Sequence, residues 1–352
     1  MHAMIRPPSS SIAHPAQPGC VRVSAPARLH LGFFDLHGGL GRSFGSLGVA
    51  VEGLGTVVSA RRACGLEVQG EQALRAREVA EALLRDAGLT DGVRLQVEQA
   101  LPEHVGLGSG TQLSLAVGTA LARLLRLPLD TRELAARLDR GRRSGIGIGA
   151  FDHGGFVVDG GRAPQGDALP PLIARLQVPP AWRWVLLFDP AHQGLSGGAE
   201  KGAFAALPRF AQRHAERLCR LVLMQLLPSL AEADIDAFGA ALTELQDCVG
   251  DHFAPAQGGR YASATVGRAL DLLRRSGAAA VGQTSWGPTG FALAASAQHA
   301  QRLLAELQAD PELRGLQPRV CATRASAARV EVLVPEAVPQ RAQSAAFAAW
   351  SA

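Results

Sequence analysis

The segment HVGLGSGTQLSLAVGTAL, residues 104–121, constrains the fold of this chain more than any other. Its glycines, Gly106, Gly108 and Gly110, follow an alternating apolar segment and lead straight into an alanine- and leucine-rich run. A strand, a glycine turn and a helix in this order present the unpaired amides and positive dipole of the first helical turn to a ligand. The pattern favours an anion site, although an ordinary turn before a core helix has the same order. It is not a Walker loop, because no lysine follows.

The size and charge of the chain narrow its class. A length of 352 residues predicts two domains, and 47% hydrophobic residues are enough for a sizeable core. The net charge of +4 comes without long basic runs, which favours small anionic substrates over nucleic acid. No segment is long and apolar enough for a membrane span. The first 19 residues, interpreted as a flexible arm, lack the apolar core of a signal peptide.

The cysteines bear on the cellular compartment. Their number is odd and no pair has the spacing of a metal clip, so reduced thiols in a cytoplasmic protein are expected. The five are Cys20, Cys64, Cys219, Cys248 and Cys321.

Hydrophobic periodicity predicts a mixed α+β chain. Residues 21–34 form two short strands or one strand with a bulge, and residues 111–127 form a helix. A second helix begins at Asp130 or Thr131 and ends before Gly141.

The domain boundary is expected near the end of a proline-rich loop at residues 163–182, which follows a strand at 156–158. The resulting division has three parts: the arm at 1–19, an N-terminal domain at 20–178 and a C-terminal domain at 179–352.

Three segments resemble the motifs of the GHMP kinase superfamily. PEHVGLGSGTQ resembles its central phosphate-binding motif, and GQTSWGPTGF resembles its third, glycine-rich motif. SGIGIGAFDHGG lies where these kinases carry a Ser-Gly segment that ends in an aspartate. The resemblance implies an N-terminal domain like that of a ribosomal protein, a ferredoxin-like C-terminal domain, and a site between them.

A closer resemblance is to one family of that superfamily, beta-ribofuranosylaminobenzene 5'-phosphate synthase. It rests on ARLHLGFFDLHG, GLGSGTQLSLAVG, RSGIGIGAFDHGGFVVDGG, GLSGG, QGGRYAS and GQTSWGPTGF in the same order, which together span most of the chain. The resemblance implies that phosphoribosyl pyrophosphate is joined to 4-aminobenzoate or 4-hydroxybenzoate, with release of carbon dioxide and pyrophosphate, in tetrahydromethanopterin biosynthesis. It also implies Mg²⁺ and a homodimer.

This reaction needs donors for the departing pyrophosphate oxygen, which gains negative charge. The glycine loop is the candidate cradle, formed by Gly106, Gly108, Ser109, Gly110, Thr111 and Gln112.

Three residues are candidates for acid–base or metal chemistry. Asp152 is the candidate base or magnesium ligand, with Ser109 as a second magnesium ligand, and the alternative is a turn aspartate with a capping role. His153 is an alternative base or a structural residue. Asp35, in the first motif, is the third candidate.

The remaining candidates are substrate contacts. Arg28 suits the ribose phosphate or the benzoate carboxylate, and the alternative is a surface arginine at a strand end. Trp286 either stacks on the aromatic acid or belongs to the core. The full set is Arg28, His30, Arg142, Arg143, Ser144, Gln257, Gln283, Ser285, Trp286 and Thr289.

Two rival functions remain open at this point. One is an ATP-dependent small-molecule kinase of the same superfamily. The other is a non-catalytic ligand-binding protein that has kept the fold.

Overall fold

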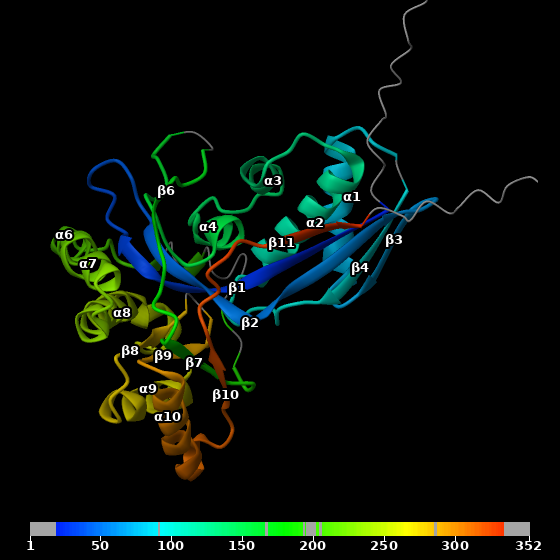
Figure 1. The fold of residues 1–352 in the computed structure, drawn as a ribbon. Coiled ribbons are helices and arrows are strands. Elements are labelled where there is room, and N and C mark those ends of the chain that lie inside the picture. Colours follow the sequence, from blue (N-terminus) through cyan, green and yellow to red (C-terminus); the bar gives the residue numbers. More distant parts are fainter. Residues whose placement is uncertain are drawn as a thin grey trace, which may run out of the picture.

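The computed structural model describes residues 19–90, 92–165, 168–192, 194, 202–203, 206–284 and 287–333. Two β-sheets meet at the centre of the molecule, and helices cover the remaining faces (Figure 1). The predicted α+β fold is confirmed.

The larger sheet has seven strands in the order β11-β1-β2-β4-β3, with β5 paired to β2 and β6 paired to β5. Helices α1 to α4 pack on one side of it. The strands are β1 (Cys20–Asp35), β2 (Gly45–Arg62), β3 (Leu66–Gly70), β4 (Val93–Gln99), β5 (Phe156–Asp159), β6 (Leu172–Leu176) and β11 (Arg329–Leu333). The helices are α1 (Ala73–Asp86), α2 (Ser109–Leu125), α3 (Thr131–Arg137) and α4 (Ile146–His153).

The smaller sheet is fully antiparallel, in the order β10-β7-β9-β8. This is the split βαβ arrangement of a ferredoxin-like domain, as the resemblance implied. Its strands are β7 (Arg183–Phe188), β8 (Ala280–Gln283), β9 (Gly290–Ala294) and β10 (Gln317–Cys321). The helical segments are α6 (Gln212–Leu221), the π-helical turn η1 (Val222–Leu226), α7 (Leu227–Ala231), α8 (Ile235–Gln257), α9 (Ala264–Arg275), α10 (Ala297–Ala309) and the 3₁₀ turn η2 (Pro311–Leu313).

Strand β1 packs against different clusters along its length. Ala25 packs in the cluster under α1 and α2, whereas Ala27 packs in the cluster with α8. The register with β2 shifts between these two residues, where β2 has the extra residues 52–54, and it shifts again at Leu31, an extra residue of β1. Residues 21–34 thus form one bulged strand, the second of the two predicted forms.

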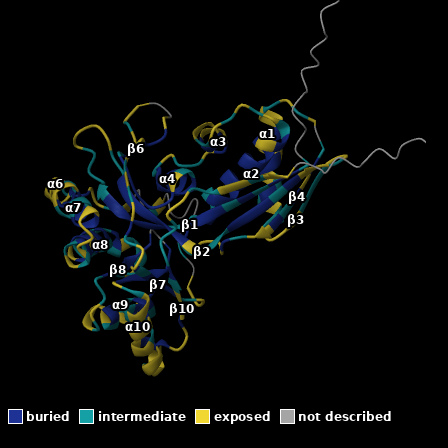
Figure 2. Ribbon diagram, viewed as in Figure 1, coloured by how far each residue is buried: buried dark blue, intermediate teal, exposed yellow. Residues whose placement is uncertain are grey.

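One hydrophobic cluster joins the two sheets. Phe156 of β5 lies edge-on to Phe238 of α8, with ring centroids 5.8 Å apart. Trp184 of β7 meets Phe291 of β9 in the same manner, also at 5.8 Å. Figure 2 shows buried residues along the larger sheet and at this junction. The position of the sheets relative to each other is therefore fixed by packing rather than by a linker.

The first and last described residues lie side by side. Strand β11 pairs with β1 in the larger sheet, and the Gly19 amide donates to the Leu333 carbonyl at 2.9 Å. The last described residues therefore pack with the first domain, and the expected boundary after residue 178 remains a prediction.

Two segments differ from the sequence interpretation. The expected loop at 163–182 contains β6, and the glycine-rich segment at 144–155 contains α4. Asp130, not Thr131, caps α3 in a complete capping box with Glu133. Among the helices in the described ranges, none has the length and apolarity needed to cross a bilayer.

Candidate active site

The loop between β4 and α2 coils tightly before the helix starts. His104, Gly106 and Gly108 all have positive φ, at 60°, 85° and 80°, values that glycine adopts most easily. Gly108 is also the N-cap residue of α2, so no side chain caps the helix there. The first-turn amides of α2 are thus left for another partner, the condition under which a helix start binds an anion.

The third glycine motif packs directly on this loop. A Cβ atom on Gly106 would lie 2.5 Å from the Thr284 carbonyl oxygen, and one on Gly287 would overlap the Gly106 backbone nitrogen. The Thr284 hydroxyl donates to the Gly106 carbonyl at 2.9 Å. The buried Thr289 hydroxyl donates to the Val105 carbonyl at 2.7 Å. Two motifs from opposite halves of the chain thus form one backbone-lined structure.

Strand β1 places Arg28 across the same loop. Its Nη1 donates to the Gly106 carbonyl at 2.6 Å, and its backbone amide donates to the Leu107 carbonyl at 3.2 Å. A Cβ on Gly108 would lie 3.1 Å from Arg28 Nε. The glycine at 108 therefore makes room for a guanidinium group beside the helix start, where it can bind a phosphate.

His30 lies next to this arginine. Its backbone amide donates to the Thr284 hydroxyl at 2.9 Å. Burial, with the positive charges of Arg28 and Arg143, holds the pKa of the His30 imidazole well below its usual 6.5. The ring is therefore neutral at physiological pH.

Two further arginines lie beside the start of α2. A Cβ on Gly110 would overlap Arg75 Nη2, and Arg75 also pairs with Glu103 at 2.7 Å. Arg140 donates from Nε to the Ser114 hydroxyl at 3.0 Å. Burial and the positive charge of Arg75 lower the pKa of Arg140. An anion at the helix start would relieve the repulsion between these two cations.

The start of α4 packs against α2 close to the loop. A Cβ on Gly147 would lie 2.9 Å from the Thr111 methyl group. The buried Gln112 donates from Nε2 to the Gly147 carbonyl at 2.9 Å. Thr111 and Gln112 therefore fix α4 against α2, in addition to any contact with substrate.

Asp159 anchors the start of α4 from β5. Its carboxylate accepts hydrogen bonds from the Ser46 hydroxyl at 2.5 Å and the Gly145 amide at 2.8 Å. It also accepts from Gly161 at 2.8 Å and from Ser144 at 3.2 Å. Burial raises the pKa of this carboxyl, and the surrounding donors oppose that rise. Ser144, a predicted substrate contact, is thus part of the support of α4.

Asp152 and His153 lie at the other end of α4. Asp152 is about 7.5 Å further along the helix axis than Gly147. Its carboxyl hydrogen-bonds Thr131 at the start of α3, and burial raises its pKa. His153 is exposed. The contacts of this pair do not include the glycine loop, and Asp152 lies in the last turn of α4 rather than in a loop turn.

Asp35 and Arg142 contact residues outside the glycine loop. Asp35 Oδ1 accepts from the amides of His37 and Gly38, at 2.8 and 2.9 Å, and so holds the turn after β1. It lies on the order of 20 Å along the strand from Arg28. Arg142 is exposed and pairs with Asp139.

Arg143 lies closer to the centre than its neighbour. Its guanidinium carbon is 5.9 Å from the ring centroid of Phe44, and its charge acts on His30. The structure therefore brings Arg143 toward His30 of β1.

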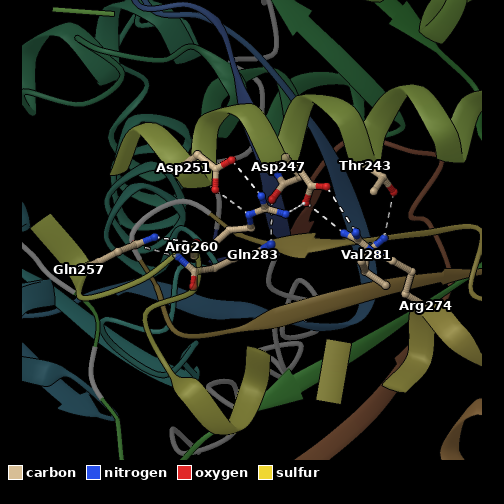
Figure 3. A network of polar contacts seen from close by, with 9 residues as sticks. Thr243, Asp247, Asp251, Gln257, Arg260, Arg274, Val281 and Gln283 are labelled. Carbon is tan, nitrogen blue, oxygen red and sulfur yellow. Dashed lines mark hydrogen bonds and ion pairs between the residues drawn. The ribbon is translucent and has the colours of Figure 1, made fainter. Parts of the chain in front are cut away.

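Gln257 and Gln283 belong to a polar network under α8 (Figure 3). Gln283 Nε2 donates to Gln257 Oε1 at 3.3 Å, and Gln257 Nε2 donates to the Arg260 carbonyl at 2.8 Å. Arg260 is clamped by Asp251, at 2.7 and 2.8 Å, and by Asp247, at 2.9 Å. This network holds the segment after α8 against β8.

The two residues predicted as magnesium ligands lie on different helices. Ser109 begins α2, whereas Asp152 contacts α3. Within the ranges that the structure describes, no three His, Cys, Asp or Glu side chains are grouped as metal ligands. Magnesium usually takes one or two carboxylates together with substrate phosphates. The carboxylate that the contacts above place at the loop is Glu103, which is paired with Arg75.

Two predicted substrate contacts, Ser285 and Trp286, lie outside the described residues, as does most of the GLSGG segment.

Sequence reasoning missed Arg75, Arg140 and the role of Asp159. The two arginines stand in ordinary helical patterns, so no local signal separates them from surface arginines. For Asp159, the two glycines that follow it indicated a turn, and the turn is where it binds the Gly161 amide.

Similarity to known protein families agrees with this geometry. Residues 74–158 match the family model for the GHMP kinases N terminal domain, and residues 226–312 match that for GHMP kinases C terminal. A beta-ribofuranosylphenol 5'-phosphate synthase of Archaeoglobus fulgidus is 36% identical over 327 residues, 89% of this chain and 100% of that protein. The protein of the same name from Methanothermobacter thermautotrophicus is 32% identical over 292 residues, 77% of this chain and 88% of that protein.

Solved structures show the same fold at low identity. Homoserine kinase from Cytophaga hutchinsonii superposes with a TM-score of 0.67 at 20% identity, covering 91% of this chain and 100% of that one. Mevalonate diphosphate decarboxylase from Staphylococcus aureus gives a TM-score of 0.60 at 14% identity, covering 89% and 98%.

Proposed function

Because the chain belongs to the beta-ribofuranosylphenol 5'-phosphate synthase family of the GHMP kinase superfamily, we infer that it joins phosphoribosyl pyrophosphate to a 4-substituted benzoate. The acceptor is 4-hydroxybenzoate or 4-aminobenzoate. The anomeric carbon of the ribose bonds to the ring carbon that bears the carboxylate, and pyrophosphate and carbon dioxide leave. The product is a C-riboside 5'-phosphate for tetrahydromethanopterin biosynthesis.

The observation that supports this assignment most directly is the packing of residues 106–110 against Thr284, Gly287 and Thr289. It offers backbone amides, the positive end of α2 and the guanidinium of Arg28 to one anion. A departing pyrophosphate gains negative charge as its bond to the ribose breaks, so fixed donors at this place lower the barrier. Arg75 and Arg140 add positive charge beside the helix start.

We propose magnesium only as an ion bound to the diphosphate of the substrate. The Ser109 hydroxyl stands at the helix start, but Asp152 does not join it, so no step is assigned to a protein-bound ion. Titrating activity with magnesium after chelation checks this. Activity that is unchanged by the chelator would remove magnesium from the proposal.

We also propose that the protein is a homodimer and that it is located in the cytoplasm. The dimer rests on the family resemblance alone, and light scattering on the purified chain tests it. The compartment is supported by the five cysteines, all of which lie in the described part of the chain and form no disulfide.

The decisive experiment uses 4-hydroxybenzoate and 4-aminobenzoate labelled in the carboxyl group, with and without phosphoribosyl pyrophosphate. The proposal expects labelled carbon dioxide only when both substrates are present, with one pyrophosphate formed for each. ATP is included as a separate arm. ADP formation with an alcohol acceptor, and no labelled gas, would instead identify a kinase; tight binding without turnover would identify a non-catalytic protein.

A further inference from the structure

A narrow cavity lies between β1, β8, α8 and the segment that follows α8. Its lining combines rings and aliphatic side chains, such as Phe33, Val249 and Phe253, with polar groups of β1 and β8. It encloses about 360 Å³ of empty space that is partly open to solvent, but only about 20 Å³ is wide enough for the centre of a water-sized sphere. A hydroxyl oxygen fits such a space, and a ring behind it requires side chains at the mouth to move.

One polar atom in this lining stands out. His30 is 97% buried and lines the cavity, and its Nε2 has no hydrogen-bond partner among the described residues. Its Nδ1 accepts from the Gly32 amide at 3.3 Å. A neutral imidazole with an accepting Nδ1 carries its proton on Nε2. An N–H donor is therefore buried at the cavity without an acceptor, which is costly unless a ligand supplies one.

Two other polar side chains of the lining, Gln246 and Gln283, already have hydrogen-bond partners. Gln246 donates to the Leu31 carbonyl at 2.6 Å and accepts from the Gln283 amide at 2.8 Å. Gln283 Oε1 accepts from Ala262 at 2.7 Å. These contacts hold both glutamines to the backbone around the cavity.

The cation at the cavity is neutralised as well. Figure 3 shows Arg260 enclosed by Asp247 and Asp251, and Asp247 also binds Arg274 at 3.0 Å. Two arginines thus face two aspartates, and the network has no net charge. The cavity therefore offers a neutral donor rather than a free cation, which suits an oxygen on an aromatic ring better than a carboxylate.

We propose that this cavity binds the para-oxygen of a 4-hydroxybenzoate, which accepts a hydrogen bond from His30 Nε2. This deepens the proposed function and rests on it. The proposal requires the carboxyl end of the ring to lie on the side of the glycine loop. His30 is linked to that loop through Thr284, whose hydroxyl accepts from the His30 amide at 2.9 Å and donates to the Gly106 carbonyl at 2.9 Å.

The hydrogen bond has a role in the chemistry. A donor to the para-oxygen favours the ionised phenolate, the electron-rich form of the ring. The ring carbon then bonds to the anomeric carbon, and the pyrophosphate leaves with the electron pair of the broken bond. When the bond to the carboxyl group breaks, its electron pair restores the aromatic ring and carbon dioxide departs. The oxygen is again a phenolate, which regains the proton lost at ionisation.

An amino group fits the same place less well. Its N–H groups are donors and its lone pair is shared with the ring, so it is a poor acceptor for Nε2–H. Sites built to bind one hydrogen-bonding group discriminate against analogues that cannot pair with it. We therefore expect the wild-type enzyme to prefer 4-hydroxybenzoate over 4-aminobenzoate in kcat/KM, by roughly tenfold or more.

The test compares His30→Phe, which keeps a ring against Phe33 but has no donor, with His30→Gln, which keeps an N–H donor. His299→Phe on α10 is the matched control. At saturating phosphoribosyl pyrophosphate, His30→Phe should lower kcat/KM for 4-hydroxybenzoate by roughly tenfold and leave that for 4-aminobenzoate nearly unchanged. His30→Gln should recover part of the preference, and the control should match the wild type.

A second measurement does not depend on turnover or on the variants. The near-ultraviolet spectrum of 4-hydroxybenzoate bound to wild-type protein should show more phenolate than the free acid at the same pH. A wild type without preference for the hydroxy acid, a bound spectrum equal to the free one, or an unchanged preference in folded His30→Phe would each overturn the proposal. Absence of carbon dioxide release with either acid would instead refute the proposed function itself.

Discussion

Position 106 requires glycine for two reasons, its backbone conformation and the close approach of neighbouring atoms. Its φ of +85° is strained for any other residue, and an added Cβ would lie 2.5 Å from the Thr284 carbonyl. Gly106→Ala should lose about 1–2 kcal/mol of unfolding free energy from the conformation. A further ~2 kcal/mol should be lost from the clash. Urea unfolding and the labelled-carbon-dioxide assay measure both effects, and activity should fall strongly.

Gly53 offers a matched control for that change. Its φ is +81°, but no atom lies within 4 Å of the position of an added Cβ. Gly53→Ala should show only the conformational cost and keep its activity. Equal losses in the two variants would mean that the contact between the two glycine motifs is not tight.

His30 should make stability depend on pH. Its folded-state pKa lies well below 6.5, so the unfolded chain binds a proton before the folded chain does. Stability is therefore full above pH 6.5 and falls below it, by about 1.4 kcal/mol for each pH unit from this group. Urea unfolding at several pH values should show this slope in the difference between wild type and His30→Phe. Parallel curves for the two proteins would contradict it.

The activity of an Asp152 variant distinguishes the catalytic role predicted from the sequence from the structural role indicated by its contacts. A general base contributes 10²–10⁴-fold to a rate, so Asp152→Asn would abolish most activity if this residue had that role. Its contact with Thr131 predicts instead that turnover stays within about threefold. Because burial raises the pKa of this carboxyl, its ionisation costs stability as pH rises through the acid range. The variant should therefore be at least as stable as the wild type at pH 7, apart from any loss at the Thr131 contact.

The glycine loop could be predicted from sequence because a strand, a glycine turn and a helix are all local features. The partners of the loop could not. Thr284 and Thr289 were recognised only as members of a second motif, and nothing local shows that their hydroxyls bind the carbonyls of Gly106 and Val105. Arg75 was missed for the same reason, since its place beside Gly110 arises from the packing of α1 on α2.

At the scale of single elements, the segment after α8 depends on one ion cluster. Arg260 makes three contacts of 2.7–2.9 Å with Asp247 and Asp251. Arg260→Ala should free this segment and raise the KM for the benzoate severalfold, while the KM for phosphoribosyl pyrophosphate changes little. Steady-state kinetics in each substrate measure this.

Arg268→Ala is the appropriate comparison. This arginine of α9 is 57% exposed in its side chain and pairs once, with Glu312 at 2.8 Å. An exposed pair of this kind contributes little, so kinetics and stability should match the wild type. A benzoate KM that rises equally in both variants would show that the Arg260 cluster has no special role.

The sequence predicted elements well where periodicity was unbroken. The helix at 111–127 is found as α2, and capping residues near 130 begin α3. Helix α4 was missed because its glycines indicate a loop, yet at Gly147 the missing side chain is what lets the helix approach Thr111. Strand β6 was missed because prolines flank it, and its order depends on pairing with β5.

The whole molecule should fold as one unit. The cluster between the sheets includes Leu29 and Leu31 of β1, Trp184 of β7 and Leu245 of α8, all fully buried. A fragment that ends at residue 178 would expose its share of this apolar surface and would lack β11. We expect a single cooperative unfolding transition for the intact chain, seen by circular dichroism and tryptophan fluorescence together. The isolated fragments should bind a hydrophobic dye and fail to unfold cooperatively.

Independent folding of either fragment, or two separated transitions in the intact chain, would contradict a shared core. Family membership is also a property at this scale. It was predictable because several short motifs recur in one order over most of the chain, although each motif alone is weak.

The hydrogen bond from Gly19 to Leu333 has one more implication. Since the described chain begins and ends side by side, its path is nearly a closed ring, and the point at which it is cut is incidental to the fold. A rearranged gene could join these ends and open the ring at an exposed turn instead, such as the one around Gly41. Fusion partners attached at Gly19 and at Leu333 would start next to each other, where β1 pairs with β11.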